Sequence, residues 1–250
     1  MNWMSNINFV LVEPREPGNI GASARAIKNM GFSRLRLVNP PDLNDEARWL
    51  AHNALDVLKS AEIFSDFRTS IADAGVVIGT TRRSGKKRGH IISLDNAAHQ
   101  IVSLAETSAV SIVFGREDRG LYNDEVEECG FLINIPASIK QPSLNLSQAL
   151  LITAYELTRA RRISNRAKHC SSALHDQHIF GMTSHAELSF LYDRISIALR
   201  SLGYIPRGDR DLEKKIMNNL KHFIGRAGLA EWELNMLHGI CTQIEKKTGN

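Results

Sequence analysis

The alternation of short β-branched stretches with segments of helical periodicity constrains this chain most. Five stretches of strand length are rich in Val, Ile and Leu: 7–12, 34–39, 76–80, 110–115 and 131–136. Segments with apolar residues at helical spacing separate them: roughly 20–30, 44–59, 93–105 and 121–128. This alternation predicts an α/β fold, with a parallel sheet covered by helices on both faces. Ligands of such sheets bind beyond the carboxyl ends of the strands.

The second half of the chain has a purely helical pattern. Residues 146–163 read as one long helix that closes a first domain, 1–163, whereas 164–183 lack periodicity and are interpreted as a linker. Ser184 and Glu187 form a capping box, which predicts the start of a helical extension over 184–250. Three apolar stripes are expected to form its core: Leu188, Leu191, Ile195, Leu199 and Leu202; Leu212, Ile216, Leu220 and Phe223; and Trp232, Met236, Ile240 and Ile244. So small a unit is expected to pack on the first domain or on a second subunit.

Composition excludes several classes of protein. Hydrophobic residues make up 43% and charged residues 23% of the chain, which argues against disorder and fibrous repeats. No apolar run approaches the roughly 20 residues of a membrane span, and the first ten residues lack the pattern of a secretory signal. We therefore expect a cytoplasmic protein. The three cysteines are widely separated, with no paired spacing for zinc or redox chemistry.

The net charge of +4 conceals two basic patches. Each holds five lysines or arginines and no acidic residue: Arg82, Arg83, Lys86, Lys87 and Arg88 in the first, and Arg159, Arg161, Arg162, Arg166 and Lys168 in the second. Such patches are typical of surfaces that bind polyanions, because each cation that neutralises a phosphate releases counterions. RNA or DNA is therefore favoured over the alternative, a solvated loop and a helix end.

A glycine-containing turn follows the first predicted strand, in the segment EPREPGNIGASARAIKNMG at 13–31. It matches neither the dinucleotide-binding pattern nor the P-loop. If a helix begins near Asn19, Gly21 and Arg25 share a face, and Arg25 reaches back over a residue without a side chain toward the positive end of the helix. This pattern predicts an anion site with a fixed arginine, against the alternative of an ordinary surface arginine.

Two further groups of polar residues lie near strand ends. Glu117 stands between Gly115 and Gly120, where a carboxylate can accept hydrogen bonds from a ligand or orient a basic group. The acidic residues that follow are interpreted as favourable charges at a helix start: Asp124, Glu125, Glu127 and Glu128. Three polar residues precede the long helix and include candidate N-caps: Ser143, Asn145 and Ser147.

Three segments together resemble a known family. NIGASAR (19–25), IVFGREDRGL (112–121) and IPASIKQPSLNLSQAL (135–150) are similar, in order and spacing, to the three motifs of the SpoU-type RNA ribose 2′-O-methyltransferases of the SPOUT superfamily. The helical tail resembles that of the tRNA cytidine/uridine 2′-O-methyltransferase branch, the TrmJ type. The resemblance spans nearly the whole chain.

The resemblance implies a sheet whose C-terminal part is tied into a deep trefoil knot, a rare exception among folds. It also implies S-adenosylmethionine as the cofactor, no metal, and a homodimer in which Arg25 of one subunit faces the cofactor of the other. The implied cofactor contacts come from the fourth predicted strand end and from the second and third motifs: Thr80, Thr81, Arg82, Gly115, Ile135, Pro142, Ser143, Leu144 and Asn145.

The implied reaction is methylation of the ribose 2′-hydroxyl of cytidine or uridine in tRNA, at the first nucleotide of the anticodon loop. Arg25 would act as a general base or as a stabiliser of the developing alkoxide. Asn19 would hold Arg25 in place, Glu117 would orient the arginine or the substrate, and Asn145 would shape the cofactor and ribose sites. The RNA backbone would contact the basic patches: Arg83, Lys86, Lys87, Arg88, Arg159, Arg161, Arg162 and Arg166.

Three alternatives remain at this point. A ribosomal-RNA 2′-O-methyltransferase of the same family would use the same mechanism. A non-catalytic RNA-binding protein could keep the fold, although the intact set of catalytic residues argues against it. A metal site could use four closely spaced residues, although their spacing matches no standard zinc pattern: His169, Cys170, His175 and His178.

Overall fold

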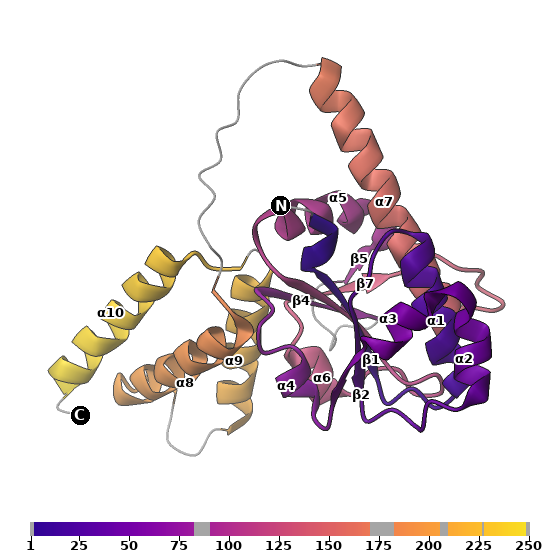
Figure 1. Ribbon diagram of the computed structural model, residues 1–250. Helices are drawn as coiled ribbons and strands as arrows, with labels where there is room; N and C mark the ends of the chain where they lie inside the picture. Colours follow the sequence, from indigo (N-terminus) through magenta and orange to yellow (C-terminus); the bar gives the residue numbers. More distant parts are fainter. Residues whose placement is uncertain (1–2, 83–90, 171–182, 206–209, 227, 249–250) are drawn as a thin grey trace.

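Seven parallel strands form one sheet in the computed structural model of the protein. The structure describes residues 3–82, 91–170, 183–205, 210–226 and 228–248, without the side chains of 165–170. The strands are β1 (Ile7–Val12), β2 (Leu35–Val38), β3 (Glu62–Phe64), β4 (Val76–Thr80), β5 (Ile91–Ser93), β6 (Val110–Phe114) and β7 (Phe131–Asn134). Their order is β3-β2-β1-β6-β4-β7-β5 (Figure 1). The predicted parallel sheet is confirmed. The two edge strands, β3 and β5, were not predicted, because three residues carry too little pattern.

Helices cover both faces of the sheet. One face packs against α1 (Pro17–Asn29), α2 (Asp45–Ala51), α3 (Leu55–Lys59), α5 (Leu94–Thr107) and α7 (Leu146–Cys170), and the other against the short helices α4 (Phe67–Ser70) and α6 (Asn123–Glu127). Two 3-10 turns complete this part of the chain: η1 (Trp3–Asn6) and η2 (His52–Ala54). The larger core includes the fully buried Phe9, Ile27 and Phe114. The β1, β6 and β4 strands are buried on both sides, as expected of a parallel sheet.

Three helix boundaries differ from the prediction. The helix expected over 44–59 is divided into α2 and α3, because His52 has a positive φ of 49° that interrupts it. Helix α1 begins at Pro17 rather than near Asn19, with proline in the first turn, where its missing N–H costs nothing. Helix α7 continues past Ile163 to Cys170, so the first residues of the predicted linker are helical.

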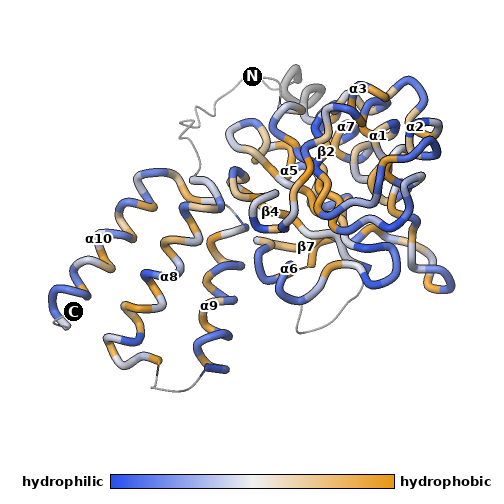
Figure 2. Tube along the Cα trace, turned by 60° about the horizontal axis from the view of Figure 1, so that its bottom comes forward, coloured by the Kyte–Doolittle hydropathy of each residue, from blue (hydrophilic) through white to orange (hydrophobic). Residues whose placement is uncertain are grey.

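The helical extension contains α8 (His185–Ser201), α9 (Arg210–Gly225) and α10 (Glu231–Thr248). The capping box that begins α8 is confirmed, since the Ser184 and Glu187 side chains each accept a hydrogen bond from the other residue's backbone N–H. Helix α8 lies between α9 and α10 (Figure 2). A small core joins them: Leu188, Leu191, Tyr192, Ile224 and Leu234.

The predicted apolar stripe of α10 is wrong in its phase. Trp232, Met236 and Ile240 are at least half exposed, whereas Leu234 and Cys241 are buried. Helix α10 packs mainly against α8 and therefore buries only a narrow face. The last residues of the other two stripes are also exposed, Leu202 directly after α8 and Phe223 on α9.

The extension packs on the α/β domain, as one of the two predicted arrangements requires. The first N–H groups of α8, from His185 and Ala186, donate to the carbonyls of Ala74 (2.7 Å) and Ala72 (3.1 Å). Gly225 at the end of α9 lies against Gly130 so closely that a Cβ on Gly225 would fall 2.6 Å from the Gly130 Cα. The contact is therefore one of backbone against backbone.

Glu128 is the charged centre of this joint. Its carboxylate lies 3.3 Å from His185 Nε2, 3.2 Å from Lys221 Nζ and 3.1 Å from a guanidinium nitrogen of Arg68. Burial opposes the charge, but the hydrogen bond from His185 and the charge of Lys221 outweigh it and lower the pKa of Glu128 to about 2. The carboxylate is therefore ionised at neutral pH and attracts basic groups of both the domain and the extension.

Candidate active site

A pocket opens beyond the carboxyl ends of β4, β6 and β7, where the parallel sheet predicts a ligand site. Eight of the residues expected to contact the cofactor line it: Thr80, Thr81, Arg82, Gly115, Ile135, Pro142, Ser143 and Leu144. Asn145 is not part of the lining and lies beside it in sequence. The pocket thus brings the second and third motifs together with the end of β4.

The loop after β6 can form this pocket because two of its residues are glycine. A Cβ on Gly115 would lie 2.2 Å from the carbonyl carbon of Gly120, so no other residue allows the loop to close on itself there. Gly120 adopts a φ of 69°, which glycine reaches without strain. At the end of β4, the Thr80 hydroxyl donates to the Val113 carbonyl at 3.0 Å and fixes the adjacent strand ends.

The lining fits a cofactor with an aromatic base and an aliphatic chain. Apolar side chains from four segments form much of the wall: Phe114, Leu121, Ile135, Pro142, Leu144, Leu146 and Ala149. The 115–121 loop adds backbone groups that can fix the orientation of a ligand. These residues therefore suit S-adenosylmethionine.

A chain of hydrogen bonds connects the three motifs beside the pocket. Asn19 Nδ2 donates to Glu117 Oε1 at 2.9 Å, and Asn145 Nδ2 donates to Asn19 Oδ1 at 2.9 Å. Asn145 Oδ1 then accepts from the backbone N–H and the hydroxyl of Ser147, at 2.9 and 2.7 Å. Three of the four predicted catalytic residues are thus in direct contact. Asn145 also fulfils the alternative role, because it caps the start of α7.

Glu117 organises the start of α1. Its carboxylate accepts hydrogen bonds from the backbone N–H of Arg15 (3.0 Å) and, at the limit of distance, from that of Glu16 (3.5 Å), in addition to Asn19. A negative charge is favourable at this end of the helix. Within the single chain, Glu117 therefore fixes the glycine turn and not the guanidinium of Arg25.

Arg25 lies on the exposed side of α1, and no hydrogen bond or ion pair joins it to the part of the chain that the structure describes. It does not line the pocket of its own chain. Gly21 also differs from its predicted role of leaving room for Arg25. A Cβ on Gly21 would lie 2.0 Å from the Ala47 carbonyl oxygen, so this glycine permits α1 to pack on α2.

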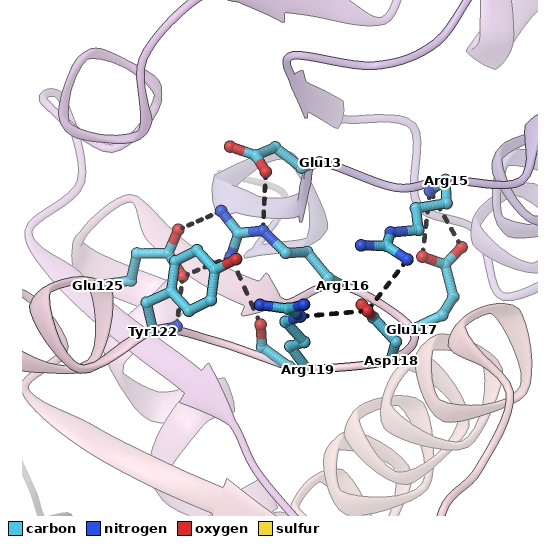
Figure 3. Close-up of polar contacts among 9 residues, drawn as sticks. Glu13, Arg15, Arg116, Glu117, Asp118, Arg119, Tyr122 and Glu125 are labelled. Carbon is cyan, nitrogen blue, oxygen red and sulfur yellow. Dashed lines mark hydrogen bonds and ion pairs between the residues drawn. The ribbon is translucent and has the colours of Figure 1, made fainter.

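Sequence reasoning missed Arg116, which lies in the second motif beside Glu117 (Figure 3). Its buried guanidinium forms a two-point ion pair with Glu125 (2.9 and 3.0 Å) and a bond of 2.8 Å to Glu13. It also lies 3.9 Å from the centre of the Tyr122 ring. Burial disfavours the charge, but the hydrogen bonds and charges of Glu13 and Glu125 raise the pKa of Arg116. Arg116 thus fastens the pocket loop to the ends of β1 and α6.

Part of this arrangement had a signal in the sequence. Glu13 directly follows β1 and Arg116 follows β6, so opposite charges stand at the ends of two strands. The pairing follows only when those strands are known to be neighbours. The interpretation of Glu125 as a helix-start charge is confirmed, since it lies in the first turn of α6, but it also pairs with Arg116. For Glu128 the interpretation is wrong, because this residue lies at the C-terminal end of α6 and pairs with the extension. Glu127 pairs with Lys214 of α9 at 2.9 Å.

The two predicted basic patches are only partly described. Arg83, Lys86, Lys87 and Arg88 lie outside the described residues, as do the side chains of Arg166 and Lys168. Of the remaining arginines of α7, Arg159 pairs with Glu156 and Arg161 with Glu106, while Arg162 is exposed. The second patch is therefore partly neutralised by nearby acids.

The alternative metal site is also not described: the structure gives no side chains for His169 and Cys170, and His175 and His178 lie outside the described residues. Within the described ranges, no three His, Cys, Asp or Glu side chains form a group that could hold a metal ion. No helix within these ranges is long and apolar enough to cross a membrane.

The parallel sheet, the glycine loop and the three linked motifs define the class of SpoU-type methylases. Residues 6–155 match the SpoU rRNA Methylase family, and residues 186–250 match the C-terminal domain of the tRNA methyltransferase TrmJ. The chain belongs to the SpoU methylase family and carries a TrmJ-type extension. The predicted family is thus confirmed.

Named relatives agree with this assignment. A tRNA (cytidine/uridine-2′-O-)-methyltransferase TrmJ of Sodalis glossinidius is 34% identical over 243 residues, which cover 97% of this chain and 92% of the relative. A tRNA/rRNA methyltransferase of Haemophilus influenzae, described as uncharacterized, is 33% identical over 98% of this chain and 96% of its own. Among solved structures, TrmJ from Z. mobilis ZM4 has a TM-score of 0.75 at 27% identity, over 95% of this chain and 98% of that one.

Proposed function

We propose that the protein transfers a methyl group from S-adenosylmethionine to the ribose 2′-hydroxyl of a cytidine or uridine in tRNA, at the first nucleotide of the anticodon loop. The observation that carries the proposal is the hydrogen-bonded chain from Glu117 through Asn19 to Asn145 beside the pocket. The TrmJ relatives are named as tRNA (cytidine/uridine-2′-O-)-methyltransferases, which supports both the reaction and a pyrimidine in tRNA as its target. A ribosomal-RNA substrate remains the second candidate, because the family description names rRNA.

The main contribution of the protein to this reaction is to align the ribose 2′-hydroxyl with the methyl group of the cofactor. When bound, S-adenosylmethionine supplies an electrophilic methyl group. The 115–121 loop and the Pro142–Leu144 segment hold and orient the cofactor, with Thr80, Thr81 and Ile135 completing the wall. Asn19 and Asn145, fixed by Glu117 and Ser147, position the ribose for in-line attack.

Arg25 stabilises the negative charge that develops on the 2′-oxygen. A guanidinium is not readily deprotonated in proteins, so this role costs less than that of a general base. Arg25 reaches the reaction from a second subunit of a homodimer. The exposure of Arg25 and its lack of partners among the described residues support a dimer. The adjacent α7 also exposes two large apolar side chains that a second subunit would cover, Leu151 (39% exposed) and Tyr155 (52% exposed).

We extend the proposal to the chain path and to the RNA surface. A deep trefoil knot over the C-terminal part of the sheet is supported by the sheet order, in which β7 is inserted between β4 and β5. The basic segments 82–88 and 159–166 contact the RNA backbone. Arg159 and Arg162 are both exposed on α7, and Arg162 forms no ion pair with the described residues. Because such an enzyme modifies tRNA, we place the protein in the cytoplasm.

Nucleoside mass spectrometry tests the function directly. The purified protein is incubated with S-adenosylmethionine and, separately, with unmodified tRNA and ribosomal-RNA transcripts. A 2′-O-methylpyrimidine in tRNA alone is the expected result, and fragment mapping locates it. Methylation of ribosomal RNA alone would change the proposed substrate but not the proposed mechanism. Cofactor binding without any product would favour a protein that binds RNA and does not modify it.

A further inference from the structure

Two arginines meet one carboxylate at the rim of the pocket (Figure 3). Asp118 Oδ2 lies 3.0 Å from a guanidinium nitrogen of Arg15 and 3.4 Å from one of Arg119. Arg15 precedes α1, and Arg119 belongs to the loop after β6, so the fold brings together two distant segments. Neither guanidinium forms another ion pair with the described residues.

The cluster holds more positive charge than its carboxylate balances. A guanidinium has five N–H donors, and a single shared carboxylate oxygen leaves most of the ten unused. The side chains of Arg15 and Arg119 are 57% and 64% exposed, and ion pairs this exposed add little to stability. Fold stability therefore does not explain the arrangement. Free, outward-facing guanidinium donors match the oxygens of a phosphate.

The position of the cluster connects it to the reacting ribose. Asp118 and Arg119 line the pocket itself. The backbone N–H of Arg15 donates to the Glu117 carboxylate, which also holds Asn19. A phosphate bound by Arg15 and Arg119 therefore lies beside the nucleotide presented to the pocket and not at a remote part of the RNA.

We propose that Arg15 and Arg119, held side by side by Asp118, bind the backbone phosphate adjoining the nucleotide that is methylated. Asp118 is the positioning residue of this site. It fixes both guanidiniums before RNA arrives, which reduces the side-chain entropy lost on binding. The identity of the RNA rests on the proposed function, but the phosphate site itself can be tested by binding alone.

The first test compares Arg15→Gln, Arg119→Gln and the double variant with the wild-type protein. Binding of a tRNA transcript is measured at several salt concentrations, together with the KM for RNA. We expect the double variant to bind roughly 10- to 100-fold more weakly and the slope of log K against log salt to fall by about 1. The affinity of Arg15→Gln for S-adenosylmethionine, measured by calorimetry, should change far less, because Arg15 does not line the pocket. Wild-type affinity and slope in the double variant would overturn the proposal.

Arg48→Gln is the matched control. Arg48 on α2 is 63% exposed and also pairs with a carboxylate, Asp45, at 3.0 Å, but it does not line the pocket. The control should keep the wild-type RNA affinity and salt slope. An equal loss in the control would mean that any exposed arginine has this effect, and the proposal would fail.

Asp118→Asn tests the positioning role. It removes a negative charge, so tRNA should bind at least as tightly at low salt, while kcat/KM for methyl transfer should fall because the two guanidiniums are no longer held. Equal kcat/KM in variant and wild type would exclude positioning by Asp118.

A neutral methylphosphonate on either side of the methylated nucleotide identifies the phosphate. At one of the two positions the modified RNA should weaken wild-type binding by the same factor as the double variant, with no further loss when both changes are combined. Additive losses at both positions would contradict the assignment. A protein that binds tRNA with the arginine-dependent slope but forms no methylated nucleoside would disprove the proposed function and leave the phosphate site standing.

Discussion

The α/β domain and the helical extension are built in different ways. In the domain, strands buried on both faces pack against helices on either side, and the polar residues beside the pocket are fixed by hydrogen bonds and, separately, by the buried ion pair of Arg116. In the extension, three helices share a small core, and large side chains such as Trp232 and Phe223 remain exposed. The domain is stabilised by its own core, whereas the stability of the extension depends on its contacts with the domain.

Helix α6 lies where the two parts meet. Glu125 on α6 points to Arg116 in the pocket loop, and Glu128, at its C-terminal end, contacts His185 and Lys221 of the extension. Substitutions inside the domain should therefore change chemistry and stability together. Substitutions at the joint should change the placement of the extension and leave the pocket intact. Four predictions test this contrast.

The largest effect is expected for Arg25→Ala. Loss of the group that we propose stabilises the developing alkoxide should reduce kcat roughly 100- to 1000-fold, whereas cofactor affinity and thermal stability should stay near wild type because Arg25 is exposed. Single-turnover methylation, calorimetric cofactor binding and thermal unfolding measure the three quantities. Arg48→Ala is the control. Full activity of Arg25→Ala would refute the catalytic assignment.

Arg116→Met should produce the next largest effect, now on stability. The change leaves Glu125 buried without its ion pair, which costs roughly 3–5 kcal/mol of unfolding free energy. Urea unfolding measures the loss. The double variant Arg116→Met with Glu125→Leu should recover much of it, because two apolar side chains replace the pair. A double variant no more stable than the single one would mean that Arg116 acts mainly through Glu13.

Gly225→Ala tests the backbone contact at the joint. The new methyl group would lie 2.6 Å from Gly130 Cα, so α9 must move, at a cost of roughly 1–3 kcal/mol. Hydrogen exchange should increase at 128–130 and at the start of α8, with little change in the domain core. Gly239→Ala on α10 is the control, because nothing lies within 4 Å of its Cβ and alanine favours a helix by roughly 1 kcal/mol. Unchanged exchange in Gly225→Ala would contradict the role given to this contact.

The smallest effect at neutral pH concerns Glu128. Its pKa in the folded protein is about 2, below the ordinary value of 4.5. The stabilisation from its charge is therefore complete above about pH 4.5 and is lost as the pH falls toward 2. Proteolytic cleavage between domain and extension should increase over that range in the wild type, and Glu128→Gln should already show increased cleavage at pH 7. A wild-type cleavage rate in the variant would exclude Glu128 as the centre of the joint.

Patterns in the sequence predicted the parts of the fold that depend on local periodicity. Runs of apolar residues predicted the long strands, and a short polar motif predicted the capping box of α8. The resemblance of three motifs assigned Asn19, Glu117 and Asn145 to one site, but their direct hydrogen bonds were not predicted. The edge strands β3 and β5 were too short to be recognised. Pairings such as Arg116 with Glu125, or Glu128 with Lys221, depend on which segments become neighbours, and charge patterns along the chain do not contain that information.

The orientation of Asn19 has a consequence for how such a site can change. Its amide donates to Glu117 through nitrogen and accepts from Asn145 through oxygen, so an aspartate could not donate and a leucine could do neither. A substitution in one motif therefore disrupts the other two at once. Over evolutionary time the three segments are expected to be inherited as one unit, and anyone moving this site to another scaffold would have to transplant all three together.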